Sequence, residues 1–287
     1  MKFKVSKGLN IPISGNINPD KKNSVSVRNV ALLGEDYHGL KPTMLVKEGN
    51  VVIKGQNLFE DKKNPGVKFT SPVSGKIVEI NRGERRSFLS MVIEKNLNST
   101  SEVTFESFQD SSELSKDSVV KNLIESGTWT SFKTRPFSKI PKIDTIPEEI
   151  FISLISSDPL SLNPEDYLNH KADDFNFGLE VISYIPKNCV HISTSSTSNF
   201  SKITSDKIQY HEFDGIHPVG LVGTQIHRIS PVSLNRTVWT INYQDVAMIG
   251  RLFKTGSLDT TRMVAFCGPQ VETPCLIETE IGASISE

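Results

Sequence analysis

The chain of 287 residues exceeds a typical single domain, and its 37% hydrophobic content is enough to form buried cores in two or three domains. Its 32 basic and 33 acidic side chains leave a net charge of −1, without the positive charge that attracts nucleic acid. No apolar run approaches the roughly 20 residues needed to span a bilayer, and the first residues lack the apolar core of a signal peptide, so we expect a soluble, cytoplasmic protein.

Residues 29–95 predict a compact all-β sandwich. Short apolar runs alternate there with Gly and Pro turns, at 30–33, 45–46, 51–53, 67–69, 77–80 and 89–93. The sequence EGNVVIKGQ, followed by SPVSGKIVEI, resembles the barrel-sandwich hybrid of biotinyl and lipoyl domains. We therefore expect residues 1–95 to form an N-terminal region that contains such a domain.

The predicted hairpin at 61–66 suggests an alternative function. Biotinyl and lipoyl domains present a lysine at the tip of this hairpin, and here Lys62 or Lys63 occupies the turn. A lipoyl or biotinyl group on either lysine would make the chain a stand-alone carrier protein. The neighbouring residues match the lysine setting of those domains incompletely, and Pro65-Gly66 is ordinary turn chemistry. A structural or docking role for this domain is therefore favoured.

Residues 96–139 are expected to form a linker and a helix. Ser, Asn and acidic residues are frequent in 96–115, which indicates a surface connection with one short strand at 103–105. Ser115 can cap a helix that Gly127 ends, because a hydroxyl accepts from free N–H groups and glycine adopts the left-handed conformation.

The next segment, TWTSFKTRPFSKIP, carries Lys133, Arg135 and Lys139 among aromatic residues. Two interpretations stay open. These cations could bind an anion such as a nucleotide phosphate, or they could form a solvated basic loop that extends over Trp129 and Phe137. The general excess of structural over functional roles favours the solvated loop.

From about residue 140 strands and helices alternate. Buried strands are expected at 151–155 and 189–193, with one helix starting at Asn163-Pro164 and a further apolar helix near 179–185 between them. Next, Pro218 predicts the first turn of a helix in which Gly220 and Gly223 share one face for close packing.

The last part of the chain continues this alternation. A strand is expected at 238–241, then a helix capped by Asn242 and ended by Gly256, then a strand at 263–267. Together these elements predict a three-layer, Rossmann-like α/β domain at 140–268. The expected fold class is therefore α/β, with the all-β domain at its N-terminus. Residues 269–287 would begin a truncated C-terminal domain, whose strand at 276–281 would lack its partners.

The sequence lacks the motifs of several cofactor and catalytic sites. It contains no GxGxxG loop, no Walker lysine and no GxSxG elbow. Neither the histidine nor the cysteine spacing matches a local metal-ligand pattern; the residues concerned are His211, His217, His227, Cys189, Cys267 and Cys275. We therefore expect no metal, no iron–sulfur cluster, no tightly bound cofactor and no catalytic residue in this chain.

Several longer segments carry a resemblance that covers nearly the whole chain. They include KGLNIPISG, the stretch from VKEGNVVIKGQ to INRGERR, RPFSKIP, HPVGLVGTQIH, TVWTINYQDV, FCGPQV and IGAS. They resemble the A-subunit family of the Na+-translocating NADH:quinone reductase, a respiratory complex of bacterial membranes. The family's polypeptide continues beyond a segment like IGASISE, so the resemblance implies a C-terminally shortened chain.

The resemblance implies a peripheral subunit on the cytoplasmic side of the bacterial inner membrane. NADH oxidation, the flavins and the iron–sulfur centre would belong to partner subunits, and this subunit would contribute to ubiquinone reduction or to assembly. The family is related in architecture to a flavin-bearing, NADH-oxidising protein, whose flavin-loop glycines are absent here, so we expect the fold without the flavin. We expect the isolated chain to be inactive.

A ubiquinone site would need an apolar cleft with a few polar groups directed at the quinone oxygens. His217, Trp239 and Tyr243 are the candidates for those contacts, and their spacing does not by itself point to a quinone site.

Overall fold

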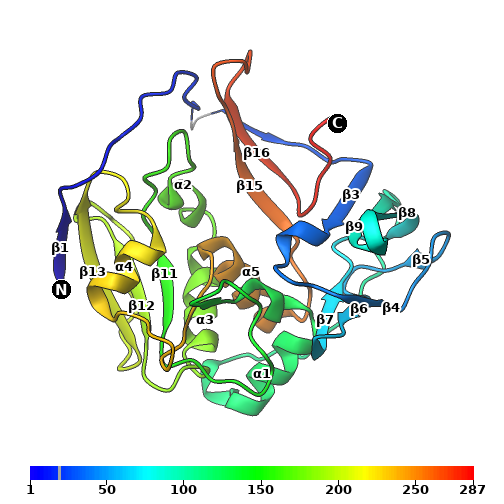
Figure 1. Ribbon diagram of the computed structural model, residues 1–287, viewed down its shortest axis with the longest axis horizontal. Coiled ribbons are helices and arrows are strands. Elements are labelled where there is room, and N and C mark those ends of the chain that lie inside the picture. Colours follow the sequence, from blue (N-terminus) through cyan, green and yellow to red (C-terminus); the bar gives the residue numbers. More distant parts are fainter. Residues whose placement is uncertain (19–20) are drawn as a thin grey trace.

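The computed structural model describes residues 1–18 and 21–287. Figure 1 shows a β-rich half next to a half in which helices cover a larger sheet, with a small third sheet between them. No helix in the described part of the chain is long and apolar enough to cross a membrane.

The β-rich half contains two sheets. Strands β3 (Asn29–Leu33), β9 (Phe88–Lys95), β8 (Gly75–Arg82) and β5 (Val51–Val52) form one sheet in that order, and β4 (Pro42–Met44), β6 (Asn57–Asp61) and β7 (Asn64–Thr70) form the other. Fully buried apolar side chains fill the space between them, among them Leu58, Phe59, Val67, Ile77 and Ile93. The predicted all-β sandwich is confirmed.

A six-stranded sheet organises the other half. Its order is β1 (Lys2–Val5), β13 (Ile208–Gly215), β12 (Val190–Thr194), β11 (Ile150–Ser153), β14 (Val238–Thr240) and β10 (Lys133–Arg135). The first five strands run parallel, and β10 is antiparallel to β14. The strands predicted at 151–155, 189–193 and 238–241 are confirmed, whereas β1, β10 and β13 were not predicted.

Three helices of this half, α1, α2 and α5, begin where the sequence provides a side-chain cap. Ser115 caps α1 (Lys116–Glu125) through its hydroxyl, and Asn163 caps the short α2 (Pro164–Leu168) with proline at its first position. Asn242 caps α5 (Tyr243–Thr255), which ends at Gly256 with a φ of 71°. These predictions are confirmed. The short 3₁₀ turns are η1 (Gly34–Asp36), η2 (Glu84–Arg86), η3 (Ser111–Glu113) and η4 (Thr128–Ser131).

Helices cover both faces of the sheet. Helix α3 (Ala172–Ile182) and α5 pack on the face that carries Ile150 and Ile152, while α4 (Val222–Ile229) packs on the face that carries Phe151. The backbones of α3 and α5 approach closely at glycines. A Cβ built on Gly250 would lie 1.7 Å from the Asp174 carbonyl oxygen, so only glycine fits there.

The helix predicted to open at Pro218 starts later. Residues 218–221 form a turn, and α4 begins at Val222. Gly220 does allow a close approach, because a Cβ there would lie 2.8 Å from the Ser157 nitrogen, but a Cβ on Gly223 would meet nothing within 4 Å. The prediction of one shared glycine face is wrong, since Gly220 lies outside the helix.

The strand predicted at 263–267 does not belong to the six-stranded sheet. It is β15 (Thr261–Phe266), which pairs with β16 (Cys275–Glu280), and β16 in turn pairs with β2 (Lys22–Ser24). The strand expected at 276–281 therefore has both partners in this chain, and the prediction that it lacks them is wrong. The domain boundaries at 95, 139 and 268 stay predictions.

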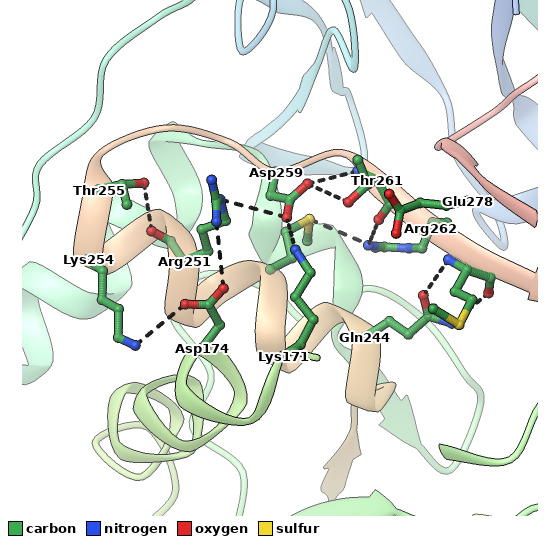
Figure 2. A network of polar contacts seen from close by, with 12 residues as sticks. Lys171, Asp174, Gln244, Arg251, Lys254, Thr255, Asp259, Thr261, Arg262 and Glu278 are labelled. Atoms are coloured by element: carbon green, nitrogen blue, oxygen red, sulfur yellow. Dashed lines mark hydrogen bonds and ion pairs between the residues drawn. The ribbon is translucent and has the colours of Figure 1, made fainter. Parts of the chain in front are cut away.

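A network of ion pairs fixes the segment that leads from α5 into β15 (Figure 2). Lys171 Nζ lies 2.9 Å from Asp259 Oδ2, and Arg251 Nε approaches the same oxygen at 3.8 Å. Arg251 and Lys254 also contact Asp174 on α3, at 3.9 and 3.4 Å. The network thus links α3, α5 and the start of the third sheet.

Candidate functional site

The strand order places a switch point between β11 and β14. The chain runs from β11 outward through β12 to β13, and then returns to the other side of β11 as β14. In open α/β sheets, ligands bind in the crevice at the carboxyl ends of the strands at such a point, because the connections leave the sheet in opposite directions. A cleft of about 480 Å³ lies there in this protein. We call it the switch-point cleft.

The loops that follow β11 and β14 form the walls of this cleft, together with the start of α4 and residues near β10. Its apolar lining comes from Ile155, Leu162, Leu221, Val222 and Ile241. Ser131, Lys133, Ser153, Tyr243 and Asp245 are among its polar lining. Polar side chains outnumber apolar ones in this lining, so the cleft could hold a small molecule that combines an apolar body with polar groups.

Lys133 is the cation of the cleft. Its ammonium lies 5.2 Å from the centre of the Tyr37 ring, and among the described residues it makes no ion pair within 4 Å. Burial lowers the pKa of Lys133, while the charges of Asp245 and Asp36 partly oppose this effect. The favoured interpretation of a solvated basic loop is therefore wrong for Lys133. It holds for Lys139, which is exposed.

Trp129 also departs from the solvated-loop interpretation. Only 1% of its surface is exposed, and its indole N–H donates to the Pro141 carbonyl at 3.0 Å. No basic side chain therefore has to cover it. Phe137, in contrast, is 69% exposed.

A second cleft of about 300 Å³ adjoins the first one. It lies between the two halves of the molecule, with Tyr37 and Phe69 on one side and Met248 and Arg262 on the other. Ser131, Lys133 and Asp245 line both clefts. Arg262 pairs with Asp245, so that carboxylate is neutralised by a neighbour other than Lys133. Lys133 thus lies at the junction of the two clefts, and the ion-pair partner of Asp245 is Arg262.

The three quinone-site candidates occupy different environments. Tyr243 lines the switch-point cleft at the start of α5, and burial raises the pKa of its phenol, so the hydroxyl stays protonated. His217 lies beside the cleft, with Nδ1 3.1 Å from Ser157 Oγ and 3.6 Å from the carboxylate of Asp158, a cleft residue. Trp239 is fully buried, and its ring packs edge-on against Trp129 at 5.3 Å.

The structure thus brings Tyr243 and the neighbourhood of His217 to one cleft, and it places the Trp239 ring in the core. Asp245 and Ser153 were missed as cleft residues, whereas Lys133 was one of the cations considered for anion binding. Ser153 is the last residue of β11 and Asp245 follows the carboxyl end of β14, and this position is the signal that identifies them.

The other two histidines considered, His211 and His227, are not among the residues that line the switch-point cleft. His211 Nε2 lies 2.8 Å from His191 Nδ1, and both rings are buried. His227 is exposed on α4. Within residues 1–18 and 21–287, no group of three or more His, Cys, Asp or Glu side chains is arranged to hold a metal ion.

Lys62 and Lys63 form the exposed tip of the hairpin between β6 and β7. Lys63 donates its ammonium to the Gly39 carbonyl at 3.0 Å, and its backbone N–H donates to Asp61 at 3.0 Å. Pro65 and Gly66 belong to strand β7, so the prediction that they form the turn is wrong.

Two family models match the chain. Residues 3–96 match the NqrA N-terminal barrel-sandwich hybrid domain, and residues 114–258 match the NqrA second alpha/beta domain. Curated relatives are named as the A-subunit of the Na(+)-translocating NADH-quinone reductase. The chain is 47% identical to the protein from Neisseria meningitidis serogroup B over 287 residues. It is 46% identical to that from Haemophilus influenzae over 286 residues and 45% identical to that from a Marinomonas species over 285 residues. Each alignment covers 99% of this chain and 64% of the relative.

Proposed function

The chain belongs to the NqrA family, and from this premise we propose that it acts within a Na+-translocating NADH:quinone reductase and contributes to its ubiquinone-reduction step. In this proposal it is a peripheral subunit on the cytoplasmic side of the bacterial inner membrane and binds other subunits of the complex. Those subunits would hold the flavins and the iron–sulfur centre. The isolated chain is expected to show no steady-state NADH oxidation.

The switch-point cleft is the observation that supports a quinone site in this chain. A quinone head group is a flat ring with two carbonyl oxygens, and reduction places negative charge on those oxygens. Apolar side chains such as Ile155 and Leu221 would contact the ring, while Lys133 would donate to one oxygen. A partly desolvated cation stabilises an anion more strongly than an exposed one, because water screens it less.

Tyr243 would supply a second donor. Its phenol is protonated at neutral pH, since burial raises its pKa. His217 lies next to Asp158 at the rim of the cleft and would orient that wall rather than contact the ring. Trp239 is the middle residue of β14, and its buried ring, packed against Trp129 and Phe132, would support the cleft floor.

Titration calorimetry with a short-chain ubiquinone tests this proposal directly. We expect saturable one-to-one binding that Lys133→Met and Tyr243→Phe weaken by roughly fivefold to tenfold, which is the effect of one lost hydrogen bond. Lys139→Met is the matched control, because Lys139 is an exposed cation of the same segment. The variants His217→Ala and Trp239→Phe test whether the other two candidates contribute to the affinity for the quinone.

The opposite result has a clear meaning. If the polypeptide binds neither the quinone nor its quinol, the site proposed for this chain is wrong. The same chain would then serve the assembly of the complex, which is the second role that family membership supports.

A further inference from the structure

The sheet face beneath α4 carries buried polar side chains where the opposite face is aliphatic. On the aliphatic face lie Ile150, Ile152, Val190 and Ile192. The face beneath α4 carries the apolar Phe151 and, beside it, several buried polar residues that together with one α4 side chain form what we call the polar seam: Glu149, Ser153, Cys189, His191, Ser193, His211 and Gln225. Burying polar groups costs free energy unless they are hydrogen-bonded, so such a row calls for an explanation.

One end of the polar seam reaches the surface. Arg236, with 30% of its side chain exposed, donates to Glu149 at 2.7 Å. Glu149 Oε2 lies 3.7 Å from His191 Nε2, and His191 Nδ1 lies 2.8 Å from His211 Nε2. Cys189 Sγ also approaches His191 Nε2, at 3.5 Å. The contacts therefore run from solvent at Arg236 to the buried ring of His211.

The other end of the polar seam reaches the switch-point cleft. Gln225 Nε2 donates to Ser153 Oγ at 2.8 Å and to the Val219 carbonyl at 3.1 Å. Ser153 Oγ donates to the Gly220 carbonyl at 3.2 Å, and both Ser153 and Gly220 line the cleft.

Three buried atoms lie between these two ends without a protein partner. They are His211 Nδ1, Ser193 Oγ and Gln225 Oε1. Ser193 is in register with Ser153 on one neighbouring strand and with His211 on the other. Leaving each such atom unpaired would cost about 1–3 kcal/mol. A buried water with two to four polar partners is the usual way in which proteins satisfy such groups.

We propose that the polar seam, completed by buried water between His211, Ser193 and Gln225, is a proton path from the surface at Glu149 to the switch-point cleft. This inference rests on the proposed function. Reduction of a quinone to its quinol takes up two electrons and two protons, one proton on each oxygen. The electrons come from the reduced cofactors of partner subunits, and the path supplies protons to the cleft end at Ser153.

Each imidazole can pass a proton without keeping a charge. It accepts a proton on one ring nitrogen and releases another from the second nitrogen, which regenerates the neutral ring. Burial keeps both rings neutral at rest: it lowers the pKa of His211 to about 4 and also lowers that of His191. The charged groups that act on them are Glu149 and Arg236 at His191, and the N-terminal ammonium at His211.

The test uses the assembled reductase with its full-length chain. Ser193→Ala removes one hydroxyl from the path, and Thr194→Val is the matched control, because the Thr194 hydroxyl is equally buried and unpaired but lies on the opposite face of β12. We expect Ser193→Ala to slow quinol formation by about a hundredfold, at the lower end of the range for assisted proton transfer. It should also raise the solvent deuterium isotope effect. Thr194→Val should change neither.

Two further measurements separate this inference from the proposed function. Electron transfer from NADH to ferricyanide takes up no protons at the cleft, so we expect Ser193→Ala and His211→Phe to leave it and quinone binding unchanged. A wild-type complex whose chain binds no quinone contradicts the proposed function. If Ser193→Ala and His211→Phe bind quinone normally and also keep the wild-type rate of quinol formation and the wild-type isotope effect, the proton path alone is overturned. The proton path is also overturned if Thr194→Val slows quinol formation as much as Ser193→Ala does.

Discussion

The side-chain amide of Gln244 pairs with the backbone of Met263 as a neighbouring strand would. Gln244 Oε1 accepts from the Met263 N–H, and Gln244 Nε2 donates to the Met263 carbonyl, both at 3.0 Å. Met263 lies on β15, the edge strand of the third sheet. One residue of α5 thereby holds β15 against the α/β half, and Figure 2 shows the Gln244 side chain beside the ion-pair network.

Gln244→Leu should destabilise the fold by about 2 kcal/mol, because two buried backbone groups would lose their partner while side-chain volume is kept. Urea unfolding of the chain measures this change. Gln109→Leu is the control, since Gln109 is exposed, and it should stay close to the wild type. Equal midpoints for all three proteins would contradict the structural role of Gln244.

Asp259 should make stability depend on acid pH. Burial raises its pKa, but the hydrogen bonds from Thr261 and Lys171 outweigh burial, so the pKa of Asp259 is lowered. A lowered carboxyl pKa contributes stability above the unfolded-state value of about 3.9, and that contribution is lost as pH falls through the folded pKa.

We therefore expect Asp259→Asn to be less stable than the wild type by about 3 kcal/mol at pH 7, since it leaves Lys171 partly buried without its charge partner. The difference should shrink below pH ~4. Thermal unfolding across this pH range measures it, with the exposed Asp206→Asn as control. A difference that stays constant with pH would show that the ionised carboxylate is not responsible.

Two glycine-to-alanine changes should have opposite signs. Gly250→Ala would place its methyl 1.7 Å from the Asp174 carbonyl oxygen and force α3 and α5 apart, at a cost of about 3 kcal/mol. Gly223→Ala meets nothing within 4 Å and should stabilise α4 by about 0.5 kcal/mol, because alanine loses less backbone freedom. Denaturant midpoints compare them, and a tolerated Gly250→Ala would refute the close helix contact.

Lys133→Met should raise stability while it weakens ligand binding. The lowered pKa of Lys133 means that the folded state disfavours its charge, so removing the charge should stabilise the fold by about 0.5 kcal/mol at pH 7. That gain should fade as pH rises toward about 10, where the lysine of the wild type also becomes neutral. A wild type more stable than the variant at pH 7 would exclude a desolvation cost at this position.

The sequence alone predicted the features that depend on short stretches of chain. Ser115, Asn163 and Asn242 cap helices because their side chains reach a backbone N–H two or three residues away. Gly256 ends α5 because a helix can end at a residue in the left-handed conformation, which glycine adopts without help from distant residues. The alternation of apolar runs and turns in 29–95 likewise predicted the sandwich, since each strand is visible in the sequence as a short apolar run between turn residues.

Partners distant in the chain were decided by the tertiary structure. The sequence pattern of a strand does not say which strand lies beside it. Local residues therefore could not predict that β1 pairs with β13, or that β15 pairs with β16 outside the α/β sheet. The candidate site depends on the same kind of contact. Lys133 belongs to a basic segment by sequence, but in the fold its charge is partly buried, and Tyr37 from the other half of the molecule lies 5.2 Å from its ammonium. Burial and electrostatics depend on the summed surroundings of a residue, and those surroundings exist only once the chain has folded.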